Sequence, residues 1–156
     1  VWVPHEPIAK NINSVYDYFL DKGYSVELYS EQNKFGTDHP RIIIVDVVGV
    51  LSKIYWNGMI AYIGGGFSTG IHNVMEPAIA RLPVIFGPNY DNFQEAIELI
   101  DLGGGWSINN NKEFYNIANK LINNEKLLLI ASEAATDVIH NNIGAATRVV
   151  RGIIRD

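Results

Sequence analysis

Apolar positions along the chain form short blocks that alternate with longer stretches of helical spacing. Blocks rich in β-branched and aromatic residues predict strands over residues 1–3, 26–29, 42–45, 59–63, 84–86 and 106–108. The block at 42–45 is apolar without alternation, which is typical of a central strand that helices cover on both faces. Strands separated by helices indicate βαβ units. The sequence therefore predicts an α/β fold, a Rossmann-like doubly wound parallel sheet of about six strands.

The stretches between these blocks predict helices. Apolar residues at 8, 12, 15, 19 and 20 keep helical spacing, and Gly23 is suited to end that helix. Residues 30–40 are expected to form a polar loop and to be the disordered part of the chain. Asn92 is placed to cap the helix that starts at Phe93, and a contribution of Asn92 or Asn89 to a ligand pocket is the alternative. Further helices are expected over residues 73–81, 93–102, 113–123, 126–142 and 145–154.

Length and charge narrow the class of protein. With 156 residues, 47% of them hydrophobic, and neither an internal repeat nor a linker, residues 1–156 are expected to form a single domain. A net charge of −5 argues against nucleic acid or an anionic membrane surface as partner. The absence of cysteine excludes disulfides and thiolate metal sites and suits the cytosol.

The ends of the chain suggest a piece of a larger protein. Val1 begins an apolar strand with no leader or cap before it, so we expect a fragment. No apolar run reaches the ~18 residues of a membrane span. We therefore expect the fragment itself to be soluble, with membrane contact only through the missing part.

Ligands of open parallel sheets bind beyond the carboxyl ends of the strands, and the richest junction there is the row GGGFSTG at residues 64–70. Glycines let the backbone approach a ligand, and N–H groups at a helix start can face an anion, so the row is suited to a phosphate. A turn that binds nothing is an equally open alternative. The row is neither G-x-G-x-x-G nor a P-loop, since it lacks the lysine.

The residues that follow the row add a carboxylate. Glu76 lies one helical turn after His72 and Asn73. An ionised carboxylate only accepts hydrogen bonds and can take two from a ribose diol, although a first-turn glutamate favoured by the helix dipole is the alternative. His72 and Glu76 also have the spacing of metal ligands, but no third ligand is near in the sequence, and we expect neither metal nor cofactor.

The row GGGFSTGIHNVMEP, the strand end P-V-I-F-G-P and the helix start N-F-Q-E resemble the carboxyl-terminal domain of the 3-deoxy-D-manno-octulosonic acid (Kdo) transferases. The resemblance runs from Val3 to about Asn123. These are glycosyltransferases of the GT-B fold that transfer Kdo from CMP-Kdo to the lipid A precursor in lipopolysaccharide biosynthesis at the cell envelope. The resemblance implies the donor-binding half of an inverting enzyme that acts without a metal.

The same resemblance assigns the rest of the reaction to the missing amino-terminal half. That half would hold the lipid A precursor and the carboxylate that acts as catalytic base. No catalytic residue is therefore expected in this chain, and the isolated chain is expected to be inactive. The parent enzyme is expected to be membrane-associated at the cytoplasmic face of the inner membrane.

The family's donor contacts carry over with departures. His5 stands where the family has an arginine, Val48 and Val50 replace a methionine and a glutamate, and Val74 replaces a proline. Backbone N–H groups around Gly65, Gly66 and His72 would steady the charge on the leaving CMP phosphate. The donor-binding set implied for CMP-Kdo is Pro4, His5, Val48, Gly49, Val50, Gly65, Gly66, His72, Asn73, Val74, Met75 and Glu76.

Two other functions remain open from the sequence. Another GT-B nucleotide-sugar enzyme, of the UDP-GlcNAc transferase or epimerase type, would use a similar glycine loop and ribose-binding glutamate. A non-catalytic nucleotide-sugar-binding module would keep the same site without the reaction.

Overall fold

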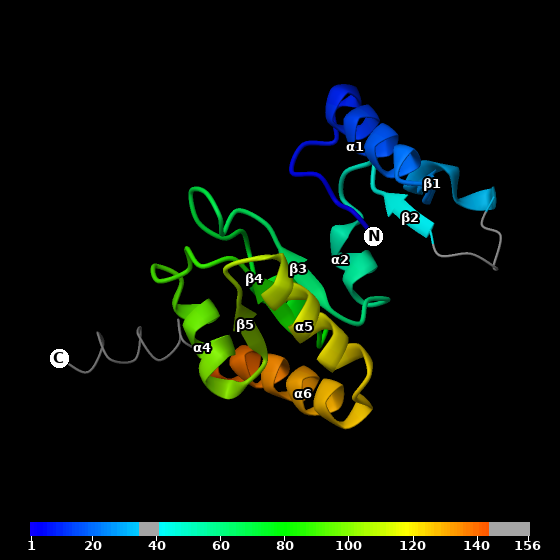
Figure 1. Ribbon diagram of the computed structural model, residues 1–156. Helices are drawn as coiled ribbons and strands as arrows, with labels where there is room; N and C mark the ends of the chain where they lie inside the picture. The colour runs from blue at the N-terminus through cyan, green and yellow to red at the C-terminus, as the bar shows by residue number, and fades with distance from the viewer. Residues whose placement is uncertain (35–40, 144–156) are drawn as a thin grey trace. The chain divides into compact units, whose positions relative to one another are not determined.

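The computed structural model describes residues 1–34 and 41–143, and the helix predicted at 145–154 lies outside these residues. The chain divides into two compact units, Val1–Leu51 and Ser52–Asp156. Both contain parallel strands covered by helices (Figure 1). That residues 1–156 form a single domain stays a prediction.

The first unit is a pair of parallel strands covered by a helix. β1 (Ser25–Leu28) pairs with β2 (Arg41–Ile44), and the last matched pair is Leu28 with Ile44. α1 (Ala9–Asp21) turns its apolar stripe to these strands, and Ile12 of the helix packs with Val26 and Ile44. The spacing of apolar residues in this helix therefore predicts both its extent and its buried face.

The predicted first strand is reduced to a single bridge in the structure. The N–H of Trp2 donates to the carbonyl of Ile43 at 2.7 Å, and the N–H of Val45 donates to the carbonyl of Trp2 at 2.9 Å. These two bonds make a parallel bridge between Trp2 and Ile44. The amino-terminal segment is thus fixed to β2 at one residue.

The second unit is built on a three-stranded parallel sheet. β3 (Ala61–Ile63), β4 (Val84–Phe86) and β5 (Gly105–Ser107) lie in the order β3-β4-β5. Around them are α3 (Met75–Ile79), α4 (Gln94–Leu102), α5 (Asn111–Ile122) and α6 (Glu125–Asn142) (Figure 1).

The central strand β4 shows why both faces of this sheet are covered. Successive side chains of a strand point to opposite faces. Val84 and Phe86 pack in one cluster, with residues of α3, α4 and α6, while Ile85 packs in another with Leu121 of α5 and Ala131 of α6. All three side chains of β4 are completely buried. The predicted α/β class with parallel strands covered on both faces is confirmed.

Several predicted boundaries differ from the structure. Five strands form in place of about six, and α2 (Leu51–Tyr55) is too short for its apolar spacing to stand out in the sequence. A 3₁₀ helix, η1 (Tyr29–Lys34), occupies the start of the expected polar loop, and residues 35–40 lie outside the described residues.

The prediction that Asn92 caps the following helix is wrong. The N-cap of α4 is Phe93, which is extended at φ −117° and ψ 96°, and no side-chain hydrogen bond caps the helix. The aromatic ring of Phe93 packs against the cluster that contains Val84 and Phe86, here called the main hydrophobic cluster. Apolar packing, rather than a polar cap, therefore sets where this helix begins.

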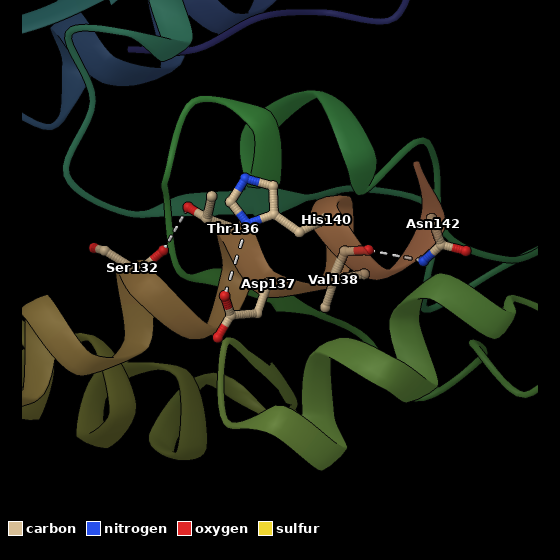
Figure 2. Close-up of polar contacts among 6 residues, drawn as sticks. All are labelled: Ser132, Thr136, Asp137, Val138, His140 and Asn142. Atoms are coloured by element: carbon tan, nitrogen blue, oxygen red, sulfur yellow. Dashed lines mark hydrogen bonds and ion pairs between the residues drawn. The ribbon is translucent and has the colours of Figure 1, made fainter. Parts of the chain in front are cut away.

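Polar contacts hold the end of α6. The hydroxyl of Thr136 donates to the carbonyl of Ser132 at 3.0 Å (Figure 2). Nδ1 of His140 lies 3.9 Å from Oδ1 of Asp137. The amide of Asn142 donates to the carbonyl of Val138 and to a carboxylate oxygen of Glu98 in α4, both at 2.8 Å. The last turn of α6 is thereby tied to α4.

No helix within the described residues is long and apolar enough to cross a membrane.

The start of α5 is fixed by reciprocal hydrogen bonds. The side chain of Asn110 accepts from the N–H of Glu113 at 3.0 Å, and the Glu113 carboxylate accepts from the N–H of Asn109 at 2.8 Å and from the Asn110 amide at 2.9 Å. The hydrogen bonds from Asn109, with that from Asn110, lower the pKa of Glu113 below its ordinary value of 4.5. A carboxyl whose pKa is lower in the folded state stabilises the fold only while it is ionised.

This predicts an acid-sensitive contribution to stability. Glu113→Gln should destabilise the protein at neutral pH. The difference in free energy of unfolding between the wild type and this variant, here called the stability gap, is fully present above the ordinary pKa of Glu113. The gap closes as the pH falls through the pKa of Glu113 in the folded state. Urea unfolding of both proteins from neutral pH down to about pH 2 measures this gap. Glu125→Gln is the control, because Glu125 lies in the first turn of α6 and interacts with the helix dipole in the same way. A stability gap for Glu113→Gln that is equally wide at every pH would contradict the stabilising role of the ionised Glu113 carboxylate.

Candidate functional site

The glycine row forms a loop that follows β3 and touches the loop after β4. Ile63 and Phe86 are paired at the ends of these parallel strands, so the loops that follow begin side by side. A Cβ atom on Gly66 would lie 2.6 Å from the backbone nitrogen of Gly87, closer than real side chains approach. Glycine at 66 therefore allows the two backbones to come into direct contact.

The same loop closes on itself at Gly65. This residue has φ +88°, and the carbonyl of Gly65 accepts from the N–H groups of Ser68 at 2.8 Å and Gly70 at 3.3 Å. Asn89, after β4, donates its N–H to the carbonyl of Gly66 and its side-chain amide to the carbonyl of Ser68, both at 2.9 Å. The loop thus has one defined backbone path, braced from the neighbouring loop by Asn89.

His72 leaves this loop toward α3. Its side chain is exposed, and its imidazole lies against the backbone of Gly64 and Gly65. Its N–H donates to the carbonyl of Gly64 at 3.1 Å. The N–H groups of Gly65, Gly66 and His72 are those expected around an anion. The N–H of His72 is thus already hydrogen-bonded within the loop.

Asn73 and Glu76 form a hydrogen-bonded pair at the start of α3. The side-chain amide of Asn73 donates to Oε1 of Glu76 at 3.1 Å, and its carbonyl oxygen accepts from the N–H of Met75 at 2.9 Å. Asn73 therefore both closes the first turn and orients the carboxylate. Oε2 of Glu76 accepts from no donor within the described residues, so it is placed to accept from a ligand.

Tyr55 is a neighbour of this carboxylate that the sequence did not indicate. Burial, and then the negative charge of Glu76, raise the pKa of the Tyr55 phenol above its ordinary value. The phenol is therefore neutral at neutral pH beside Glu76. The sequence gives little indication of this contact, because Tyr55 lies at the end of α2, a helix too short for its apolar spacing to stand out.

The two residues between Asn73 and Glu76 face the core. Val74 is only 4% exposed and belongs to the main hydrophobic cluster, and Met75 packs against the same cluster. Their side chains therefore fix the position of α3, and a ligand would meet them through the backbone.

The first unit holds the remaining predicted residues, and most of them line a hollow. Its volume is about 160 Å³, and it is lined by Val3, Pro4, His5, Pro7, Val45, Val47, Val48, Gly49 and Leu51. Four predicted residues are among these: Pro4, His5, Val48 and Gly49. Val50 is not. The lining is mainly apolar, which suits a flat ring more than a charged group.

The predicted residues therefore fall into two groups, one in each unit. Within the residues that the structure describes, no three His, Asp or Glu side chains gather in a way that could hold a metal ion.

Relatives agree on a class of enzyme. No family model matches the chain. The chain is 32% identical over 132 residues to the 3-deoxy-D-manno-octulosonic acid transferase of Chlamydia pneumoniae, which covers 81% of this chain and 29% of that protein. The chain is a relative of the Kdo transferases. A bifunctional glycosyltransferase/methyltransferase of Fusobacterium nucleatum is 39% identical over 101 residues, 63% of this chain and 16% of that protein.

A solved structure shows the fold of these transferases. The carboxyl-terminal CMP-Kdo binding domain of WaaA from Acinetobacter baumannii matches with a TM-score of 0.76 and 20% identity, over 88% of this chain and 72% of that one. This relative of the Kdo transferases thus has the fold of such a carboxyl-terminal domain. The chain spans less than a third of the length of its Chlamydia pneumoniae relative.

A matched pair of glycine-to-alanine substitutions tests the close backbone contact between the loops after β3 and β4. Gly66→Ala would place Cβ 2.6 Å from the Gly87 backbone, so one loop must move, whereas Gly64→Ala meets its nearest atom, Cδ2 of His72, at an ordinary 3.6 Å. We expect Gly66→Ala to lower the free energy of unfolding by about 1–3 kcal/mol and Gly64→Ala by less than about 1 kcal/mol. Urea unfolding compares them, and equal stability of the two variants would exclude the close backbone contact.

Proposed function

We propose that this chain is the part of a Kdo transferase that binds the donor, CMP-Kdo. The similarity to Kdo transferases over 81% of the chain carries the proposal. The CMP-Kdo binding named for the Acinetobacter baumannii domain supports the same donor. The acceptor in this proposal is a lipid A precursor, bound by a part of the protein outside this chain.

The Asn73 and Glu76 pair gives the proposal its chemistry. A ribose offers two neighbouring hydroxyl donors, and an ionised carboxylate only accepts. With Oε1 of Glu76 held by Asn73, the carboxylate has a fixed orientation before a ligand arrives. A group fixed in advance loses less conformational entropy on binding. Glu76 is therefore proposed to hold the ribose of CMP.

The glycine loop, in the same unit as Glu76, would take the phosphate of the nucleotide. In this proposal the loop around Gly65 and Gly66 offers backbone N–H groups to the phosphate. Taken by itself, the apolar hollow of the first unit, which includes Pro4 and Val48, suits a flat ring such as a pyrimidine. In this arrangement binding needs no divalent ion.

The reaction in this proposal is an inverting transfer. A hydroxyl of the acceptor attacks the anomeric carbon of Kdo, the bond from that carbon to the phosphate oxygen breaks, and CMP leaves with the bonding electrons. The hydroxyl proton passes to a carboxylate base outside this chain. Positioning of the donor is then the contribution of the chain described here, and the chain alone binds without turnover.

Glu76→Gln tests the ribose contact. Hydrogen bonds to charged groups are worth about 1.5–3 kcal/mol, so the substitution should weaken CMP roughly ten- to a hundredfold, while 2′,3′-dideoxy-CMP should be nearly unaffected. Calorimetric titration of both nucleotides measures this, and the melting temperature reports whether the fold is intact.

The control is Glu95→Gln, because Glu95 lies in the first turn of α4 and is also half-buried. It should leave both affinities unchanged. Equal losses for CMP and its dideoxy analogue in Glu76→Gln would reject the ribose contact.

A further inference from the structure

Ser30 and Asp46 form a doubly hydrogen-bonded pair, here called the Ser30–Asp46 clasp. The N–H of Ser30 donates to Oδ1 of Asp46 at 2.9 Å, and the hydroxyl of Ser30 donates to Oδ2 at 2.5 Å. One serine thus engages both oxygens of the carboxylate. Each partner lies two residues beyond the last matched pair of β1 and β2, Leu28 with Ile44, so the parallel register brings them side by side.

Asp46 leads directly into one wall of the hollow. The next three residues, Val47, Val48 and Gly49, all line it. Their side chains do little to fix the backbone, because Val47 is 36% exposed and Val48 is 79% exposed. Without burial, the path of this segment depends on what holds its two ends. Asp46 holds the first end through Ser30, and α2 begins just after the other.

The Asp46 carboxylate is suited to this task. Burial acts to raise its pKa, but the hydrogen bonds from the hydroxyl and the N–H of Ser30 outweigh burial and lower the pKa below its ordinary value of 3.8. Asp46 is therefore ionised at neutral pH. Hydrogen bonds to an ionised acceptor are shorter and stronger than those between neutral groups.

We propose that the Ser30–Asp46 clasp positions residues 47–49, so that the hollow keeps the shape needed to hold a nucleotide base. Ser30 and Asp46 are positioning residues that act through Val47, Val48 and Gly49. That the occupant is a nucleotide rests on the proposed function, whereas the positioning of the segment does not.

The experiment compares Ser30→Ala with Ser30→Thr in the whole chain. Alanine removes the hydroxyl donor, and threonine keeps it. Backbone amide resonances of residues 47–49 are followed by NMR without ligand, and CMP is then titrated into each protein. Ser14→Ala, an exposed serine of α1 in the same unit, is the control.

In Ser30→Ala the amides of residues 47–49 should shift and broaden, and CMP should bind roughly three- to tenfold more weakly. Ser30→Thr and Ser14→Ala should match the wild type in both readouts. Asp46→Asn, which removes the charge at constant size, should disturb the same amides as Ser30→Ala.

The outcomes separate the two proposals. Unchanged amides of residues 47–49 in Ser30→Ala would overturn the clasp, as would equal disturbance in Ser30→Ala and Ser30→Thr. If these amides respond as expected but CMP does not bind the wild type, the positioning of the segment is upheld and the proposed nucleotide ligand is rejected.

Discussion

Parallel strands that are paired in register must start their following loops side by side, and the arrangement of both candidate groups depends on this constraint. Ile63 and Phe86 end a matched pair, so the glycine loop begins next to Gly87 and is braced by Asn89. Leu28 and Ile44 end another, which brings Ser30 to Asp46. Residues distant in sequence thereby meet at the carboxyl ends of strands, where open α/β sheets bind their ligands.

The sequence predicts well those elements whose buried residues recur along the chain with the spacing of a helix or a strand. The apolar spacing of α1 gives that helix and its buried face, and the continuous apolar run that includes Ile44 gives the strand β2, against which the structure packs one helix, α1. Short elements escape this logic: α2 has five residues, too few for a helical period to show. The N-cap of α4 is Phe93 rather than Asn92, because packing of Phe93 prevails over the capping preference of Asn92.

The candidate site was predicted only in part, for a related reason. Residue types at a junction indicate which groups can contact a ligand, and Asn73 and Glu76 do lie together, joined by a hydrogen bond. Side-chain direction is a tertiary property, however, and Val74 proves to be a core residue. The partnership of Ser30 with Asp46 could not be inferred without the strand register, since sixteen positions separate them in the sequence.

Calorimetric titration of the chain with CMP and with UMP, each in the presence of a chelator, tests the proposed binding of a cytidine nucleotide by this Kdo-transferase relative. CMP and UMP differ in the hydrogen-bonding groups at one edge of the ring, and a mismatch there costs roughly tenfold in affinity or more. We expect saturable binding of CMP without a divalent ion and much weaker binding of UMP. Equal affinity for the two nucleotides, or binding of neither, would contradict this proposal.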